Sequence, residues 1–302
     1  MATAQKVAVL TPVVERRQTS LWRDAWRRLV RHNGARLGFV LVVGLVALAF
    51  LAPLIARTLG TDPNDTVLTE TLRPLSPAHP MGTDDLGRDV FTRVAYGAQV
   101  SLRVGLVAIS LAAVLGSFIG FTAGFFGRWW DQLAMRAMDI ILAFPTLLLA
   151  IAIVAMRGPG IFNTMLAVGI VRVPAYARIS RASTISLREQ DFVTAARSVG
   201  VPERRILFRH VMPNSLSPLI VQGTLGIATA ILDAAALGFL GLGAQPPDVE
   251  WGAMLVDSIR YLFQGSWWAL LFPGFAIMLT VIGFNLIGDG LRDSLDPRLR
   301  TS

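Results

Sequence analysis

Six long apolar blocks constrain this chain more than any other feature of its sequence. They are residues 37–56, 100–126, 140–156, 161–176, 216–242 and 267–287. At a rise of about 1.5 Å per residue, a helix of about 20 residues spans the hydrocarbon core of a bilayer. Only 16% of the residues are charged, which is too few for the surface of a soluble domain of 302 residues. The sequence therefore predicts an all-α polytopic membrane protein with six transmembrane helices, of which 161–176 is the shortest.

Arginine placement predicts the orientation of these helices. If the amino terminus is cytoplasmic, most arginines fall in the cytoplasmic segments, whereas acidic residues outnumber arginines in the outer segment 57–96. This distribution follows the positive-inside rule and places both termini in the cytoplasm. The net charge of +8 is then a consequence of topology. Nucleic-acid binding is not expected, because there is no soluble basic domain to carry it.

The apolar blocks divide the chain into four parts. Residues 1–36 form a cytoplasmic tail, in which apolar and basic residues at helical spacing over 21–31 predict an interfacial amphipathic helix. Residues 37–96 hold the first transmembrane helix and an extracytoplasmic segment, in which Thr83 or Asp84 is expected to cap a helix. Residues 97–290 form a core of five transmembrane helices, and residues 291–302 form a cytoplasmic tail.

Small residues recur at every fourth position in two of the predicted crossings. This spacing makes a flat helix face against which a neighbouring backbone packs closely, and we favour that interpretation over the lining of a pathway. Pro145, Pro174 and Pro273 are each expected to kink a crossing. The small residues are Ala112, Gly116, Gly120 and Gly124 in one crossing, and Gly226, Ala230, Ala234 and Gly238 in the other.

Four ionisable residues lie within or at the ends of the predicted crossings, where an unpaired charge is costly. One interpretation is a proton relay of the kind found in a proton-coupled secondary transporter. The other is buried ion pairing, with Arg172 bound to either Asp139 or Asp233, and we favour it because there is a single basic partner. The four residues are Asp139, Arg172, Asp233 and Asp289.

Enzymatic chemistry has few residues to work with. Lys6 is the single lysine, so a GxxxxGK[ST] phosphate loop is excluded and the chain has no ATPase site of its own. The three histidines lie outside the apolar blocks, and there is no HExxH motif or cysteine. We therefore expect no catalytic residue, no metal site and no cofactor on this chain.

Residues 191–213 form a basic amphipathic segment on the predicted cytoplasmic side. Phe192, Val193, Ala196 and Val199 recur at helical spacing and predict a helix with one apolar face. Gly200 is expected to end this helix and Pro202 to begin a second one. A short helix at this position is suited to docking a partner protein.

The order TAARSVG, Ile206, His210 and Pro213 resembles the EAA loop of importer permeases of the ATP-binding cassette (ABC) superfamily. The stretches HPMGTDDLGRDVFTRVAYG, AGFFGRWWDQLAMRAMDIILAFPTLLLA, AALGFLGLGAQPPDVEWG and FNLIGDGLRDSLDPRLR are similar to the dipeptide/oligopeptide group. Within that group, residues 231–247 are most similar to C-type dipeptide permease subunits. The resemblance covers nearly the whole chain and implies the type I ABC importer architecture in a bacterial inner membrane.

This resemblance implies a set of partners. They are a homologous second permease subunit, two cytoplasmic ATPase subunits that bind ATP and Mg, an extracytoplasmic solute-binding protein, and membrane lipid. It also implies that segment 189–212 couples the permease to the ATPases. The carried-over coupling positions are Thr194, Ala195, Ala196, Arg197, Gly200, Ile206, His210 and Pro213. Thr194 stands where glutamate is usual, so an ion pair from that position is not expected.

The implied function is import of dipeptides or short peptides, and oligopeptides, glutathione and nickel chelates are alternative solutes within the group. On the outer side, polar residues of two segments are candidates to contact the binding protein and gate the outer mouth. The equal alternative is that they hold the outer loops together. These residues are Asp84, Asp85, Arg88, Asp89 and Trp251.

Overall fold

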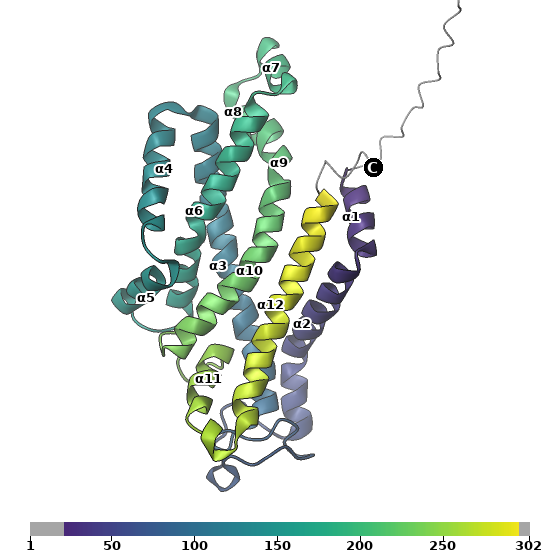
Figure 1. The fold of residues 1–302 in the computed structure, drawn as a ribbon, viewed down its shortest axis with the longest axis vertical. Helices are drawn as coiled ribbons and strands as arrows, with labels where there is room; N and C mark the ends of the chain where they lie inside the picture. Colours follow the sequence, from purple (N-terminus) through teal and green to yellow (C-terminus); the bar gives the residue numbers. More distant parts are fainter. Residues whose placement is uncertain (1–20, 296–302) are drawn as a thin grey trace, which may run out of the picture.

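The computed structural model describes residues 21–295, which fold into a helical bundle (Figure 1). The predicted all-α class is confirmed. The long helices are α2 (Asn33–Leu59), α3 (Val90–Phe126), α6 (Ile161–Arg188), α10 (Leu216–Phe239) and α12 (Trp267–Leu295). The shorter elements are α1 (Leu21–Arg31), η1 (Leu68–Glu70), α4 (Arg128–Leu142), α5 (Thr146–Arg157), α7 (Asp191–Ser198), α8 (Glu203–Ile206), η2 (Leu207–Val211), α9 (Met212–Asn214), α11 (Trp251–Ile259) and η3 (Leu262–Gln264).

Four helices, α2, α3, α10 and α12, are long and apolar enough to span a membrane. The bent pair α4 and α5 adds a fifth candidate. The fourth predicted crossing is the first part of α6, a helix of 28 residues that carries Arg172 and Pro174 in its interior. Together these segments are compatible with the predicted number of six.

The block 140–156 is not one kinked helix as predicted. α4 and α5 meet at 89°, and the break falls at residues 143–145. Pro145 explains the break, because it lacks a backbone N–H and disfavours helical backbone at Phe144. With φ −55° and ψ 129°, Pro145 stands directly before the first turn of α5. The chain therefore turns sharply where the sequence predicted a continuous crossing.

The expected helix start at Thr83 or Asp84 is also wrong. Helix α3 begins at Val90, and the Asp89 carboxylate caps it by accepting a 2.7 Å hydrogen bond from the Thr92 N–H. Asp84 instead accepts hydrogen bonds from the N–H groups of Leu86 and Arg88, which closes a turn before the helix. From Val90, α3 runs unbroken through the second predicted crossing.

The stripes of small residues pack helices together, as predicted. A Cβ atom on Gly124 would lie 2.8 Å from the Arg181 carbonyl oxygen, and one on Gly120 would overlap the Ala177 carbonyl. Both contacts are between α3 and α6. On α10, a Cβ atom on Gly226 would lie 2.6 Å from the Tyr176 hydroxyl. Glycine at these positions allows the backbones to approach closely.

The bundle has two distinct ends (Figure 1). One end holds α7 and α8, together with α1 and the last turns of α12. The opposite end holds α11 and the loop between α2 and α3. Both ends of the described chain therefore lie on the side of α7, as an even number of crossings requires.

Candidate functional site

Local sequence determines where α7 begins and ends. Asp191 lies in its first turn and Arg197 in its last, and both charges suit the helix dipole. Gly200 adopts φ +79°, the left-handed conformation that favours glycine, and the Val201 N–H donates to the Ala196 carbonyl oxygen at 3.1 Å. Pro202 then precedes α8. The predictions that Gly200 ends one helix and Pro202 begins the next are confirmed.

Helix α7 presents apolar residues on two sides, which corrects the single apolar face predicted from spacing. Val193 is fully buried in the core cluster that contains Ile206, and half-buried Ala196 packs beside it. Phe192 and Val199, which were predicted to share that face, are 39% and 78% exposed. With exposed Ala195, they follow the i, i+3, i+7 pattern of a docking helix. We call Phe192, Ala195 and Val199 the outer face of α7.

Arg197 is held within this chain. Its Nε and Nη2 atoms donate to the two Glu203 carboxylate oxygens at 2.8 and 3.2 Å. Its guanidinium also lies 5.9 Å from the centre of the Phe125 ring at the end of α3. Arg197 therefore fixes α7 to α8 and to α3, and Thr194 beside it remains exposed.

The remaining coupling candidates lie beyond the turn. Ile206 is fully buried, His210 is half-buried and Pro213 is exposed. Residues 207–211 form the π-helical turn η2, which ends two residues before Pro213. A proline that donates no hydrogen bond is a local reason for such a turn. The structure thus gathers the predicted positions at one end of the bundle, with three roles: an exposed face, a turn and a buried support.

Helix α6 connects this segment to the bundle. Arg181 donates to both oxygens of Asp131 on α4, at 2.5 and 2.7 Å. Arg188 donates to the Phe125 carbonyl at the end of α3, at 3.1 Å. α7 begins three residues after Arg188, so these contacts tie the segment directly before α7 to α3 and α4.

The charges within the predicted crossings favour pairing. Arg172 on α6 donates to Asp233 on α10 through Nε at 3.2 Å and also through Nη2. Asp139 pairs with Arg178 at 2.6 Å, not with Arg172. Asp289 is exposed near the end of α12. Cation–carboxylate pairing accounts for three of the four charges and leaves the proton relay without a supporting contact. The sequence-based set omitted Arg103, which lies within the block 100–126.

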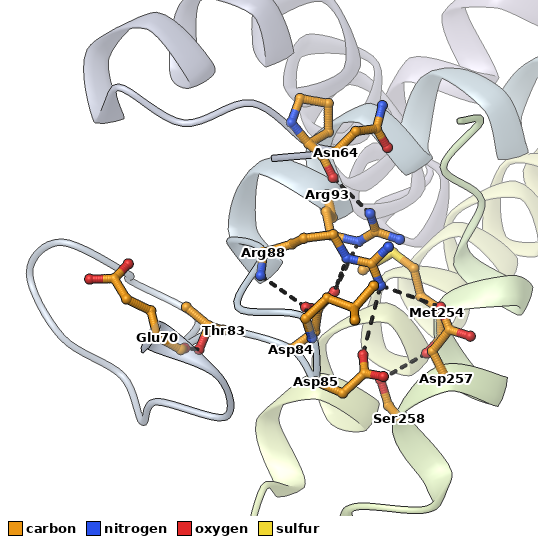
Figure 2. A network of polar contacts seen from close by, with 12 residues as sticks. Asn64, Glu70, Thr83, Asp84, Asp85, Arg88, Arg93, Met254, Asp257 and Ser258 are labelled. Atoms are coloured by element: carbon orange, nitrogen blue, oxygen red, sulfur yellow. Dashed lines mark hydrogen bonds and ion pairs between the residues drawn. The ribbon is translucent and has the colours of Figure 1, made fainter. Parts of the chain in front are cut away.

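At the opposite end, Asp84, Asp85, Arg88 and Arg93 form one network with Asp257 (Figure 2). Asp84 accepts from Arg88 Nε at 2.7 Å and lies 3.4 Å from Arg93 Nε. Arg88 Nη2 lies 3.6 Å from Asp257 on α11 and 3.7 Å from Asp85. Burial raises the pKa of Asp85, and the nearby charges of Asp84 and Asp257 add to the increase.

Two further residues hold the outer loop. Trp251 is fully buried and donates its indole N–H to the Val94 carbonyl at 3.0 Å, so in this structure it is not a surface contact for a binding protein. Asp89 is 2% exposed and contacts His79 Nδ1 at 3.0 Å in addition to capping α3. Together with the network around Asp84, these contacts favour the stapling interpretation of the outer residues over direct partner contact.

Sequence reasoning missed Glu250, a buried carboxylate at the same end. It caps α11 by accepting hydrogen bonds from the N–H groups of Gly252 and Ala253 at 2.8 and 3.0 Å, and from the Ser101 hydroxyl at 3.3 Å. Burial raises its pKa, and these hydrogen bonds oppose the increase. Helix α11 was not predicted from the sequence, so the capping position of Glu250 directly before it was not recognised.

Comparison with known proteins gives a consistent result. Residues 116–301 match the family described as binding-protein-dependent transport system inner membrane component. Residues 20–77 match the N-terminal transmembrane domain of oligopeptide transport permease C. Among solved structures, an inward-facing form of the MetNI methionine ABC transporter has a similar fold. Its TM-score is 0.53 at 18% identity, over 67% of this chain and 96% of that one.

Several curated relatives cover nearly the whole chain. The dipeptide transport system permease protein DppC of Alkalihalophilus pseudofirmus is 50% identical, over 93% of this chain and 91% of the relative. The di/tripeptide permease DppC of Pseudomonas aeruginosa is 43% identical, over 93% of each chain. The glutathione permease GsiD of Escherichia coli is also 43% identical, over 92% of this chain and 91% of the relative.

The helical bundle, its apolar spans and these matches define a multi-pass permease subunit of an ATP-driven importer. The chain belongs to the family of binding-protein-dependent transport system inner membrane components. The resemblance noted from the sequence is confirmed.

Proposed function

We propose that this subunit forms half of a translocation pathway for dipeptides or short peptides. The relative at 50% identity is named a dipeptide permease and one of those at 43% a di/tripeptide permease, which supports this solute class. The other half of the pathway is a homologous permease subunit. An extracytoplasmic binding protein delivers the peptide, and two ATPase subunits bind ATP and Mg on the cytoplasmic side.

In this proposal, α7 is the coupling helix and its end of the bundle is cytoplasmic. The single observation that carries the assignment is the outer face of α7, where Phe192, Ala195 and Val199 are exposed although all three are apolar. An amphipathic helix with anchors at i, i+3 and i+7 is suited to a groove on a partner. The arginine excess of the segments at this end supports the cytoplasmic orientation.

The mechanism is alternating access by rigid-body motion. Closure of the ATPase pair draws the two coupling helices together and opens the pathway toward the binding protein. In this chain, Val193 and Ile206 hold α7 on the core, and Arg188 joins α6 to the end of α3. These contacts let α7 move together with the long helices instead of bending separately.

A charge on the outer face of α7 tests the coupling assignment. We expect Ala195→Glu to insert normally and to lose ATPase co-purification and dipeptide uptake, because its carboxylate enters the partner's apolar groove without a counterion. Gln132→Glu, which adds the same charge at an exposed position on α4 outside segment 189–212, is the matched control and is expected to retain both. Normal uptake by Ala195→Glu, with normal ATPase co-purification, contradicts the assignment.

The solute class needs a separate measurement. Purified complex is reconstituted in vesicles with its binding protein, and ATP hydrolysis is measured with a panel of dipeptides, longer peptides, glutathione and nickel chelates. We expect the largest stimulation from dipeptides or other short peptides. Stimulation by glutathione or by nickel chelates alone removes the peptide assignment and leaves the coupling role intact.

A further inference from the structure

Arg103 differs from four other arginines on α3 and α6. It lies on α3, thirteen residues after Val90, and is exposed. Arg93 on the same helix, and Arg172, Arg178 and Arg181 on α6, each contact a carboxylate. For Arg103, no carboxylate of residues 21–295 lies within ion-pairing distance. An ionisable residue within a span is a candidate functional site by default, and the described residues supply no counter-charge for Arg103.

Arg103 lines a groove of about 480 Å³ between α2 and α3. The walls are otherwise mainly apolar, with Val46 and Phe50 from α2 and Leu102 and Leu106 from α3. Phe50 is 82% exposed and Leu106 is 57% exposed. The groove is therefore an open apolar channel on the outside of the bundle with one cationic group in it.

The other polar groups of the groove are satisfied within the chain. Pro53 has no N–H to donate, which frees the Ala49 carbonyl one turn earlier on α2. The Gln99 side-chain amide fills this gap with a 2.7 Å hydrogen bond to that carbonyl. Arg103 is thus the polar group of the groove that is left for a ligand.

The groove lies toward the end of the bundle that holds the outer loop. Pro53 is six residues before the end of α2, or about 9 Å along the helix. Arg103 is about 20 Å from the start of α3, a helix that runs for about 55 Å. A long arginine side chain at this depth extends toward the lipid headgroups while its stem stays in the hydrocarbon.

We propose that this groove binds one anionic phospholipid from the leaflet at the outer-loop end. An acyl chain lies along Val46, Phe50 and Leu106, and the phosphate accepts hydrogen bonds from the Arg103 guanidinium. Arginine suits this role because its planar donors match phosphate oxygens in pairs. The guanidinium matches an anionic headgroup and the apolar walls match an acyl chain. A soluble anion would contact the guanidinium alone, so the groove favours a lipid.

Native mass spectrometry of the purified full chain, with the subunits that co-purify, tests the site. The complex is titrated with phosphatidylglycerol, and the affinity of the tightest-bound lipid is compared between variants. We expect Arg103→Ala to weaken it about fivefold or more. Arg103→Lys should lose less, and Val46→Trp should weaken binding by filling the groove. Arg57→Ala, which removes a cation at the end of α2, is the control and should bind as the wild type does.

Equal lipid affinity in the wild type and Arg103→Ala overturns the proposal. A photoreactive residue at Leu106 provides a second readout that does not depend on removing the charge. Capture of phosphatidylglycerol is the expected result, and capture of a second polypeptide instead assigns the groove to a protein interface and also overturns it. Both experiments measure lipid binding and not peptide transport. Failure of the lipid proposal would therefore leave the proposed transport function untouched.

Discussion

The two ends of the bundle use their candidate residues in opposite ways. At the α7 end, Phe192, Ala195 and Val199 are apolar and exposed, and they make an outer face that the rest of residues 21–295 leaves uncovered. At the outer end, Asp84 and Arg93 are charged and buried, at 5% and 6% exposed, and they contact one another. This difference agrees with our proposal that the α7 end docks a partner, whereas the contacts of the outer network hold its own loops together.

The largest expected effect is at the outer end. Asp84→Ala leaves the Arg93 guanidinium buried without its carboxylate, and removing one partner of a buried pair costs about 3–5 kcal/mol. We expect a large fall in the thermal stability of the detergent-purified protein. Asp248→Ala, which removes an exposed acid at the same end, should change it little. Unaltered stability in Asp84→Ala would show that the network is not what holds the outer loop.

A pair of glycines sharpens the comparison between the ends. Gly200 follows α7 with φ +79°, and Gly265 follows η3 with φ +89°. A Cβ atom added to either glycine would have no non-adjacent described residue within 4 Å. Alanine at either site should cost about 1–2 kcal/mol from left-handed backbone strain alone. Both variants should therefore lose similar stability, measured by thermal unfolding. Only Gly200→Ala should also lower the ATP hydrolysis stimulated by the binding protein.

Equal loss of stimulated hydrolysis in the two glycine variants would contradict this prediction. That result would mean that stability alone, and not the direction of α7, limits coupling. The two substitutions are matched in size, backbone conformation and lack of neighbours, so the comparison isolates position in the fold.

A substitution at Trp251 is expected to lower stability by a smaller amount. Trp251→Phe keeps most of the buried ring and removes the hydrogen bond to the Val94 carbonyl, which should cost about 1 kcal/mol in stability. Because Trp251 is fully buried, the affinity for the binding protein should stay within twofold of the wild type, as measured by surface plasmon resonance. A large affinity loss without a stability loss would restore the gating interpretation.

The last prediction is a pH dependence of stability from Glu250, for which burial sets the direction. Its pKa in the folded protein is raised above the ordinary value of 4.5, so the folded state binds the proton more tightly than the unfolded state. The stability contribution is therefore complete below pH 4.5 and is lost as the pH rises through the raised folded-state pKa. Glu250→Gln should flatten this part of the stability profile, and an unchanged pH slope would contradict the burial argument.

What the sequence predicted correctly was encoded locally. The spacing of apolar residues and the position of Gly200 predicted α7. The recurrence of small residues at every fourth position predicted the packing faces of α3 and α10. These features follow from helix geometry and from the conformations open to glycine, so neighbouring residues are enough to predict them.

What the sequence did not predict depends on residues far apart in the chain. The Trp251 indole meets a carbonyl 157 residues away, and Arg172 selected Asp233 on another helix over Asp139. The division of the apolar residues of α7 into a buried side and the outer face depends on the core cluster in which Val193 is buried. The sequence gives the type and helical spacing of these residues. Contacts between distant segments determine which of them are buried and which are exposed.

Cross-linking from the outer face of α7 tests the central claim most directly. The chain has no cysteine, so Ala195→Cys introduces a single reactive thiol on the outer face. Asp248→Cys places a matched thiol at an exposed position at the other end. In intact membranes, a short thiol cross-linker should join Ala195→Cys, and not Asp248→Cys, to an ATPase subunit. Capture of an ATPase subunit from Asp248→Cys, or from neither position, would contradict the account.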